Sequence, residues 1–236
     1  MMNRMRLLVV LMLLAVVPAM AQETPANAET PESIRKRNET DQRVYQLAIR
    51  YNDMAVARTK LMELIERNPT NARYGELLAT LYFETNQFSA AALTALDVLQ
   101  VNDRSIEALE IAAYSLEQIG ALDRSLTQFE RLYLLTDDIF ALYKSAYLQF
   151  SLKKFDEAMN SINMLVKNAK SAEEKLGFPI SDTENQEVSM RAAALNLKAL
   201  VYVEQGSTED ARKAYQEALA LEPDFKLAKD GLNDLK

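Results

Sequence analysis

Residues that favour a tight turn between helices recur along this chain at a spacing of 34 positions. The series is Asn52, Asn86, Gly120 and Lys154. Asparagine and glycine tolerate the left-handed backbone conformation that reverses a helical chain. After the first three turns comes an apolar residue and, three positions later, a small one, as with Phe88 and Ala91. A fixed period of this length predicts an array of stacked helical hairpins, because a single hairpin cannot bury its own apolar face.

The composition suits helices and removes several kinds of chemistry. Hydrophobic residues make up 49% of the 236, whereas Gly (5) and Pro (6) are scarce, which argues against a β-sandwich. Cys, His and Trp are absent, so Cys/His zinc sites, disulfides, thiol chemistry and histidine-based triads are excluded. Glycine-rich phosphate loops and nucleophile elbows are missing, and acidic pairs such as Asp137 and Asp138 fall where helix capping explains them. The sequence therefore predicts a non-enzymatic protein with no catalytic, metal-binding or cofactor-binding residues.

The period divides the chain into five units. We expect them at about 38–71, 72–105, 106–138, 139–170 and 192–223. In the fourth unit the apolar and small residues, Phe155 and Ala158, follow the turn one position early, so the spacing slips to 33. The step from Lys154 to Gly206 is 52, which predicts an insertion between the last two units.

That insertion is expected at about 171–188. The second helix of the fourth unit should continue to about Lys175 and be followed by a loop, with Ser181 and Glu184 capping the next helix. Residues 224–236 combine apolar and charged positions in the manner of the solvating helix that closes the last open face of a repeat array. A C-terminal capping helix is therefore predicted there.

The first 21 residues have the pattern of a secretory signal peptide. Arg4 and Arg6 precede an apolar run over 7–17, and an A-x-A cleavage pattern ends at Ala21. Cleavage after Ala21 would leave no integral membrane segment and would place the protein in the periplasm or outside the cell. Residues 22–37 are polar without apolar periodicity and are expected to form a disordered tether. Removal of the two arginines would change the net charge from −7 to −9, which disfavours nucleic acid as a partner.

Small and aromatic residues flank the turns at fixed spacing on both helices of a unit. The last unit carries Ala199, Tyr202, Gly206, Ala211, Tyr215, Ala218 and Pro223. The second unit carries Leu78, Ala79, Tyr82, Asn86, Phe88 and Ala91. This pattern resembles the tetratricopeptide-repeat family over about 38–223. The resemblance implies an all-α fold, a right-handed α-solenoid of about five antiparallel hairpins, whose first helices line a concave groove that holds a partner protein or peptide.

Mapping that groove onto this sequence gives a set of candidate partner-binding residues. They are Glu76, Thr80, Phe83, Glu110, Tyr114, Glu117, Tyr143, Tyr147 and Phe150. The carboxylates would favour basic segments. The aromatic stripe of the fourth unit has two interpretations: counting forward from the third unit places Tyr143 and Phe150 in the core, whereas counting back from Phe155 and Ala158 turns the stripe to the groove, with Ala146 packed inside.

The predicted function is that of a protein–protein interaction scaffold of the cell envelope, with the partner bound in the groove. Two alternatives remain. The array could be a self-assembly module that forms a homodimer, with the insertion contacting other copies. It could also bind carbohydrate or peptidoglycan, because aromatic side chains stack on sugar rings, although the stripe contains no Trp.

Overall fold

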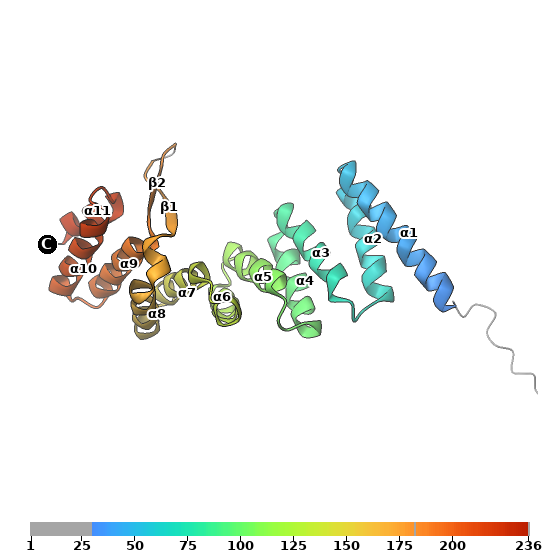
Figure 1. The fold of residues 1–236 in the computed structure, drawn as a ribbon, viewed down its shortest axis with the longest axis horizontal. Coiled ribbons are helices and arrows are strands. Elements are labelled where there is room, and N and C mark those ends of the chain that lie inside the picture. Colours follow the sequence, from blue (N-terminus) through green and yellow to red (C-terminus); the bar gives the residue numbers. More distant parts are fainter. Residues whose placement is uncertain (1–29, 182, 236) are drawn as a thin grey trace, which may run out of the picture.

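A computed structural model describes residues 30–181 and 183–235, and within them the chain is an elongated stack of α-helices with one small β-hairpin (Figure 1). The α-helices are α1 Pro31–Arg50, α2 Met54–Arg67, α3 Ala72–Glu84, α4 Phe88–Val101, α5 Ile106–Gln118, α6 Leu122–Thr136, α7 Ile139–Ser151, α8 Phe155–Lys167, α9 Met190–Glu204, α10 Thr208–Leu221 and α11 Lys226–Asp234. Consecutive helices pair into five antiparallel hairpins, and α11 packs on the last of them. The predicted all-α solenoid is confirmed. None of these helices is long and apolar enough to cross a membrane.

Each hairpin turns at one residue with a positive φ angle. These residues are Asn52, Asn86, Gly120, Lys153 and Gly206. The fourth turn therefore lies at Lys153 and not at Lys154. The residue missing from the 34-residue spacing is lost before α7. Asp137 adopts a left-handed conformation (φ 55°) that ends α6 and lets α7 begin one residue early.

A small residue lies seven positions before each of the last four turn residues. These residues are Ala79, Ala113, Ala146 and Ala199, all with 0–1% of their surface exposed. Alanine leaves room for the second helix of the hairpin to pack closely against the first, and the surrounding leucines and aromatics fill the core. The burial of Ala146 shows that α7 has the register counted back from Phe155 and Ala158, with Ala146 as its small packing residue.

The insertion forms a hairpin and not the predicted helical extension. Helix α8 ends at Lys167, a 3₁₀ turn (η1) spans Ala169–Ala172, and strands β1 (Lys175–Pro179) and β2 (Asn185–Ser189) pair antiparallel. Proline favours extended backbone before it and lacks an amide hydrogen, so Pro179 suits a strand end better than a helix. The expected cap at Ser181 and Glu184 is also wrong, because Ser189 accepts the hydrogen bond from the Ala192 amide at the start of α9.

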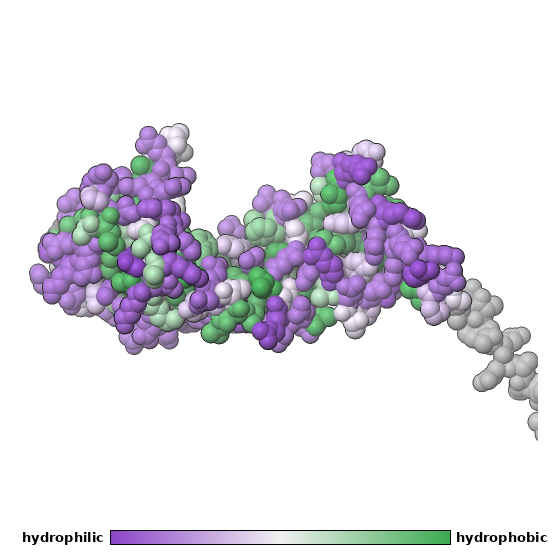
Figure 2. Space-filling model, viewed as in Figure 1, coloured by the Kyte–Doolittle hydropathy of each residue, from purple (hydrophilic) through white to green (hydrophobic). Residues whose placement is uncertain are grey.

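The base of the hairpin is fixed to the last unit. Leu176 and Val188 face each other across the strands and are both buried. The carboxylate of Glu222, which follows α10, accepts hydrogen bonds from Lys175 Nζ and from the Ser189 amide, both at 2.9 Å. These bonds lower the pKa of Glu222. Figure 2 shows the surface hollowed between the projecting hairpin and the N-terminal helices.

The first helix begins earlier than expected. Thr30 caps α1 by accepting a hydrogen bond from the Ser33 amide, and Pro31 occupies the first helical turn, where its missing amide hydrogen costs nothing. Residues 31–37 are therefore helical, and the predicted disordered tether is wrong for that stretch. The predicted signal peptide and residues 22–29 lie outside the described residues.

Candidate functional site

The first helices of the second, third and fourth units contact one another through polar side chains. Glu107 on α5 accepts hydrogen bonds from Thr80 (2.9 Å) and Arg73 (3.0 Å) of α3. Glu117 on α5 pairs with Lys144 of α7 at 2.6 Å. These contacts put α3, α5 and α7 side by side on one face, as the sequence predicted for the groove. We call this surface the inner face.

Two of the predicted carboxylates already have partners within the chain. Glu76 accepts a hydrogen bond from the hydroxyl of Ser105 at 2.7 Å, next to the start of α5. Glu117 is neutralised by Lys144, and both side chains are 18% exposed. Glu76, Thr80 and Glu117 therefore help to align neighbouring units, and they offer little free charge to a partner.

Glu110 is the predicted carboxylate that lies free. It is exposed and has no ion pair or hydrogen bond to another described residue. Partial desolvation, followed by the negative charges of Asp138 and Glu107, raises the pKa of Glu110. The centre of the inner face therefore holds an uncompensated negative charge.

The predicted aromatic residues of the second and third units are half-buried. The Phe83 ring lies 6.5 Å from that of Tyr114, which in turn meets Phe129 edge-on at 5.1 Å. Burial and the nearby carboxylates, Glu110 first among them, raise the pKa of Tyr114. These rings tie one unit to the next and are only partly exposed at the surface.

The fourth-unit stripe follows the register that turns it to the inner face. Ala146 is fully buried, whereas Tyr147 is 45% exposed. Tyr143 and Phe150 are half-buried, and Phe150 packs against Phe155 with 6.3 Å between the ring centroids. Burial raises the pKa of the Tyr143 hydroxyl. The interpretation that placed Tyr143 and Phe150 in the core is therefore wrong for the stripe as a whole.

A cavity of about 430 Å³ lies beside this stripe, and we call it the hairpin cavity. Its lining residues are Tyr143, Lys144 and Tyr147 of α7, Phe178 and Pro179 of β1, Asn196, Leu197 and Leu200 of α9, and Leu227 of α11. Sequence reasoning found the tyrosines but missed the rest. One signal was available: Asn196 lies ten positions before its turn residue, as Tyr143 and Glu110 do before theirs.

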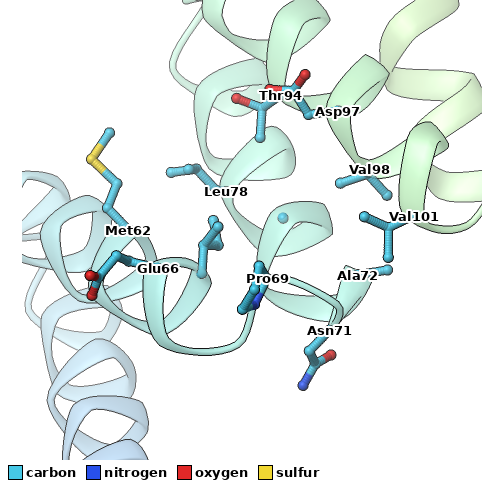
Figure 3. A pocket seen from close by; sticks show the side chains of 12 residues that line it. Met62, Glu66, Pro69, Asn71, Ala72, Leu78, Thr94, Asp97, Val98 and Val101 are labelled. Carbon is cyan, nitrogen blue, oxygen red and sulfur yellow. The ribbon is translucent and has the colours of Figure 1, made fainter.

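A second cavity, of about 310 Å³, lies among α2, α3 and α4. Figure 3 shows the side chains that line it, among them Met62 and Glu66 on α2 and Asp97 and Val98 on α4. Its lining is mainly apolar, and Glu66 and Asp97 have no ion pair with another described residue. None of the predicted groove residues lines it. Across residues 30–181 and 183–235, no three acidic side chains gather in a group that could hold a metal ion.

The architecture defines this chain as a helical-repeat solenoid with a preformed inner face. Two stretches match family profiles of the tetratricopeptide repeat, residues 140–171 and 192–225. These two stretches are tetratricopeptide repeats, and the other described hairpins share their helical-hairpin architecture. A comparison with curated protein sequences gives no match.

Solved structures of low sequence identity share the fold. MamA superposes with a TM-score of 0.61 at 16% identity, over 80% of this chain and 93% of its own. YrrB, described as a tetratricopeptide-repeat protein with an unusual peptide-binding site, superposes with a TM-score of 0.64 at 14% identity. The match covers 85% of this chain and 98% of the YrrB chain. MamA from Desulfovibrio magneticus RS-1 superposes with a TM-score of 0.57 at 12% identity, over 80% of this chain and 97% of its own. At these identities the likeness extends to the fold alone.

Proposed function

We propose that this protein is a non-enzymatic scaffold of the cell envelope that holds a cationic segment of a partner protein against its inner face. The fold is one that serves protein–protein interaction, and YrrB provides a peptide-binding example. The observation that carries the cationic preference is Glu110, which is exposed and unpaired beside the charges of Asp138 and Glu107. The envelope location is supported by the leader-like sequence of residues 1–21.

A lysine or arginine of the partner would relieve this negative potential. Exposed ion pairs contribute about 0.2–1 kcal/mol each, so the charge selects among partners and speeds their encounter more than it sets the affinity. Most of the affinity would come from contact area on aromatic surface, of which Tyr147 is the most exposed on the inner face.

The test is affinity capture from an envelope extract with the purified protein as bait, followed by calorimetry on the captured segment. We expect a basic segment whose dissociation constant rises about two- to fivefold in Glu110→Gln and less at high salt. Tyr147→Ala should weaken it further. Glu217→Gln, which makes the same charge change on α10, is the matched control and should have no effect.

The double variant Glu110→Gln with Tyr147→Ala tests the assignment to the inner face. If this variant keeps its fold and captures the same partners with the affinity of the wild type, the assignment is refuted. The envelope location is tested separately, by sequencing the amino terminus of the protein purified from its source. A chain that begins at Gln22 supports export, and a chain that keeps Met1 contradicts it.

A further inference from the structure

The β-hairpin has one strand fastened to the last unit and one strand whose outer edge is open. At the base of the hairpin the Met190 amide donates to the Glu174 carbonyl at 2.8 Å. At its tip the Ile180 amide donates to the Glu184 carbonyl at 2.9 Å. In an antiparallel pair, residues bonded to the facing strand alternate with residues whose N–H and C=O groups point away from it. Even-numbered residues of both strands are therefore bonded across the hairpin, and odd-numbered residues form its two outer edges.

Strand β2 is fastened to the link between α10 and α11, which partly covers its outer edge. The outward amide of Ser189 donates to the Glu222 carboxylate at 2.9 Å. The Gln186 side chain donates to the Asp224 carbonyl at 2.7 Å and accepts from the Lys226 amide at 2.9 Å. One side of the hairpin is thus occupied by the chain itself.

The outer edge of β1 has no such cover. It consists of Lys175, Gly177 and Pro179, which are all exposed, and no described residue bonds their outward backbone groups. A Cβ atom added to Gly177 would meet no atom within 4 Å apart from its chain neighbours. A row of free N–H and C=O groups at the edge of a sheet is a template for another strand.

The charge of this edge suits a second copy of the same chain. The chain has a net charge of −7, but β1 contains no carboxylate side chain. Its only charged residue, Lys175, is paired with Glu222 at 2.9 Å. Like charges that face each other across two strands are destabilising, and two β1 strands avoid this cost.

The bonding pattern of the edge is complementary to itself. We propose that two copies of the chain pair antiparallel through the outer edges of their β1 strands, centred on Gly177. The two Gly177 residues exchange both hydrogen bonds, and the Lys175 amide of each copy donates to the Pro179 carbonyl of the other. Pro179, which has no N–H, serves only as an acceptor. Leu176 of each copy lies opposite Phe178 of the other, on the buried face of the hairpin.

The shape of the molecule is compatible with this pairing. The hairpin projects from the helical stack (Figure 1), and the surface beside it is hollowed (Figure 2). Antiparallel pairing places the base of each hairpin beside the tip of the other, so the two stacks lie at opposite ends of a four-stranded sheet. The hairpin cavity takes Phe178 and Pro179 from β1 and, among the described residues, none from β2, so its apolar lining adjoins the open edge.

The experiment measures the mass of the full chain by light scattering and sedimentation over a range of protein concentrations. Two five-residue strands make a small interface, so we expect a reversible dimer with a dissociation constant in the micromolar to millimolar range. Gly177→Pro removes an N–H that points away from β2 and leaves the bonds of the hairpin in place. It should raise the dissociation constant about tenfold or more, because two hydrogen bonds of the dimer are lost.

Glu187→Pro is the matched control. Glu187 faces Gly177 across the hairpin, so this variant makes the same change on the outer edge of β2 and should leave the dimer unaffected. Hydrogen exchange in the wild type needs no variant: the Gly177 amide should exchange about tenfold more slowly in concentrated than in dilute protein, whereas the Glu187 amide should not change. The Phe178 amide, which is bonded within the hairpin, reports whether the hairpin of Gly177→Pro is intact.

Three results overturn the inference. The first is a chain that stays monomeric up to about 1 mM. The second is a Gly177→Pro variant with a protected Phe178 amide that dimerises as the wild type does. The third is protection of Gly177 that appears only when a captured partner segment is added, which would assign the edge to that partner. The pairing is independent of the proposed function, because it does not involve Glu110, and partner selection through Glu110 stands or falls by its own test.

Discussion

A methyl group added to Gly75 tests the packing between the two helices of the second unit. A Cβ atom built on Gly75 would lie 2.5 Å from Val98 Cγ2 and 3.9 Å from Val98 Cβ. The first distance is a clash and the second is ordinary van der Waals contact. Valine in a helix has one strongly preferred rotamer, so Val98 cannot turn its methyl group away without strain.

Two opposing effects decide the outcome. In an exposed helix Gly→Ala stabilises by about 0.5–1 kcal/mol, whereas overpacking a tight contact costs about 1–3 kcal/mol. Gly75→Ala alone should therefore lower the free energy of unfolding by about 0.5–2 kcal/mol. In the background of Val98→Ala, which removes the clashing methyl group, the same substitution should raise it by about 0.5–1 kcal/mol.

The measurement is a double-mutant cycle by urea unfolding, followed by circular dichroism at 222 nm. The change of sign between the two backgrounds is the diagnostic result, and it corresponds to a coupling energy of about 1–3 kcal/mol. An equal effect of Gly75→Ala in both backgrounds, of either sign, would show that the contact with Val98 does not limit this position.

Asp41→Asn should lower the free energy of unfolding by about 2–3 kcal/mol, because buried Asp41 is the shared partner of Lys60 (3.1 Å) and Arg67; exposed Glu39→Gln is the control in the same melts. Burial opposes ionisation of Asp41, but hydrogen bonds and charges from Lys60 and Arg67 outweigh it and lower its pKa. The stabilisation by Asp41 is thus complete above the ordinary pKa of 3.8 and is lost as pH falls through the depressed pKa. The free energy of unfolding should therefore fall more steeply with decreasing pH in the wild type than in Asp41→Asn. Lys153→Gly should stabilise by about 0.5–1 kcal/mol, since Lys153 holds φ at 59°; an unchanged melting temperature would contradict this.

The fold could be predicted from the sequence because its determinants are local. A turn residue, an apolar residue and a small residue at fixed spacing specify one hairpin, and each hairpin contacts mainly its neighbours. Glu110 and Tyr147 could be placed on the inner face for the same reason, once their position relative to the turn was known. The sequence could not show which carboxylates were free, since Glu76 and Glu117 find their partners in the next unit.

Three features were decided only by the tertiary structure. The register of α7 depended on a one-residue difference at Asp137, whose left-handed backbone resembles that of other turns but shortens the link between α6 and α7. The insertion became a hairpin because pairing across the strands and docking on Glu222 stabilise it, and neither partner is adjacent in sequence.

The third feature is the hairpin cavity. It joins Tyr143, Phe178, Asn196 and Leu227, which lie on four different elements and follow no common spacing. A repeat pattern predicts on which face of its helix each side chain lies. A cavity also depends on the distance between the packed helices and strands, which the pattern does not contain. The 34-residue period therefore determined that this protein is a stack of helical hairpins, and only the packing of an irregular segment against that stack created the hairpin cavity.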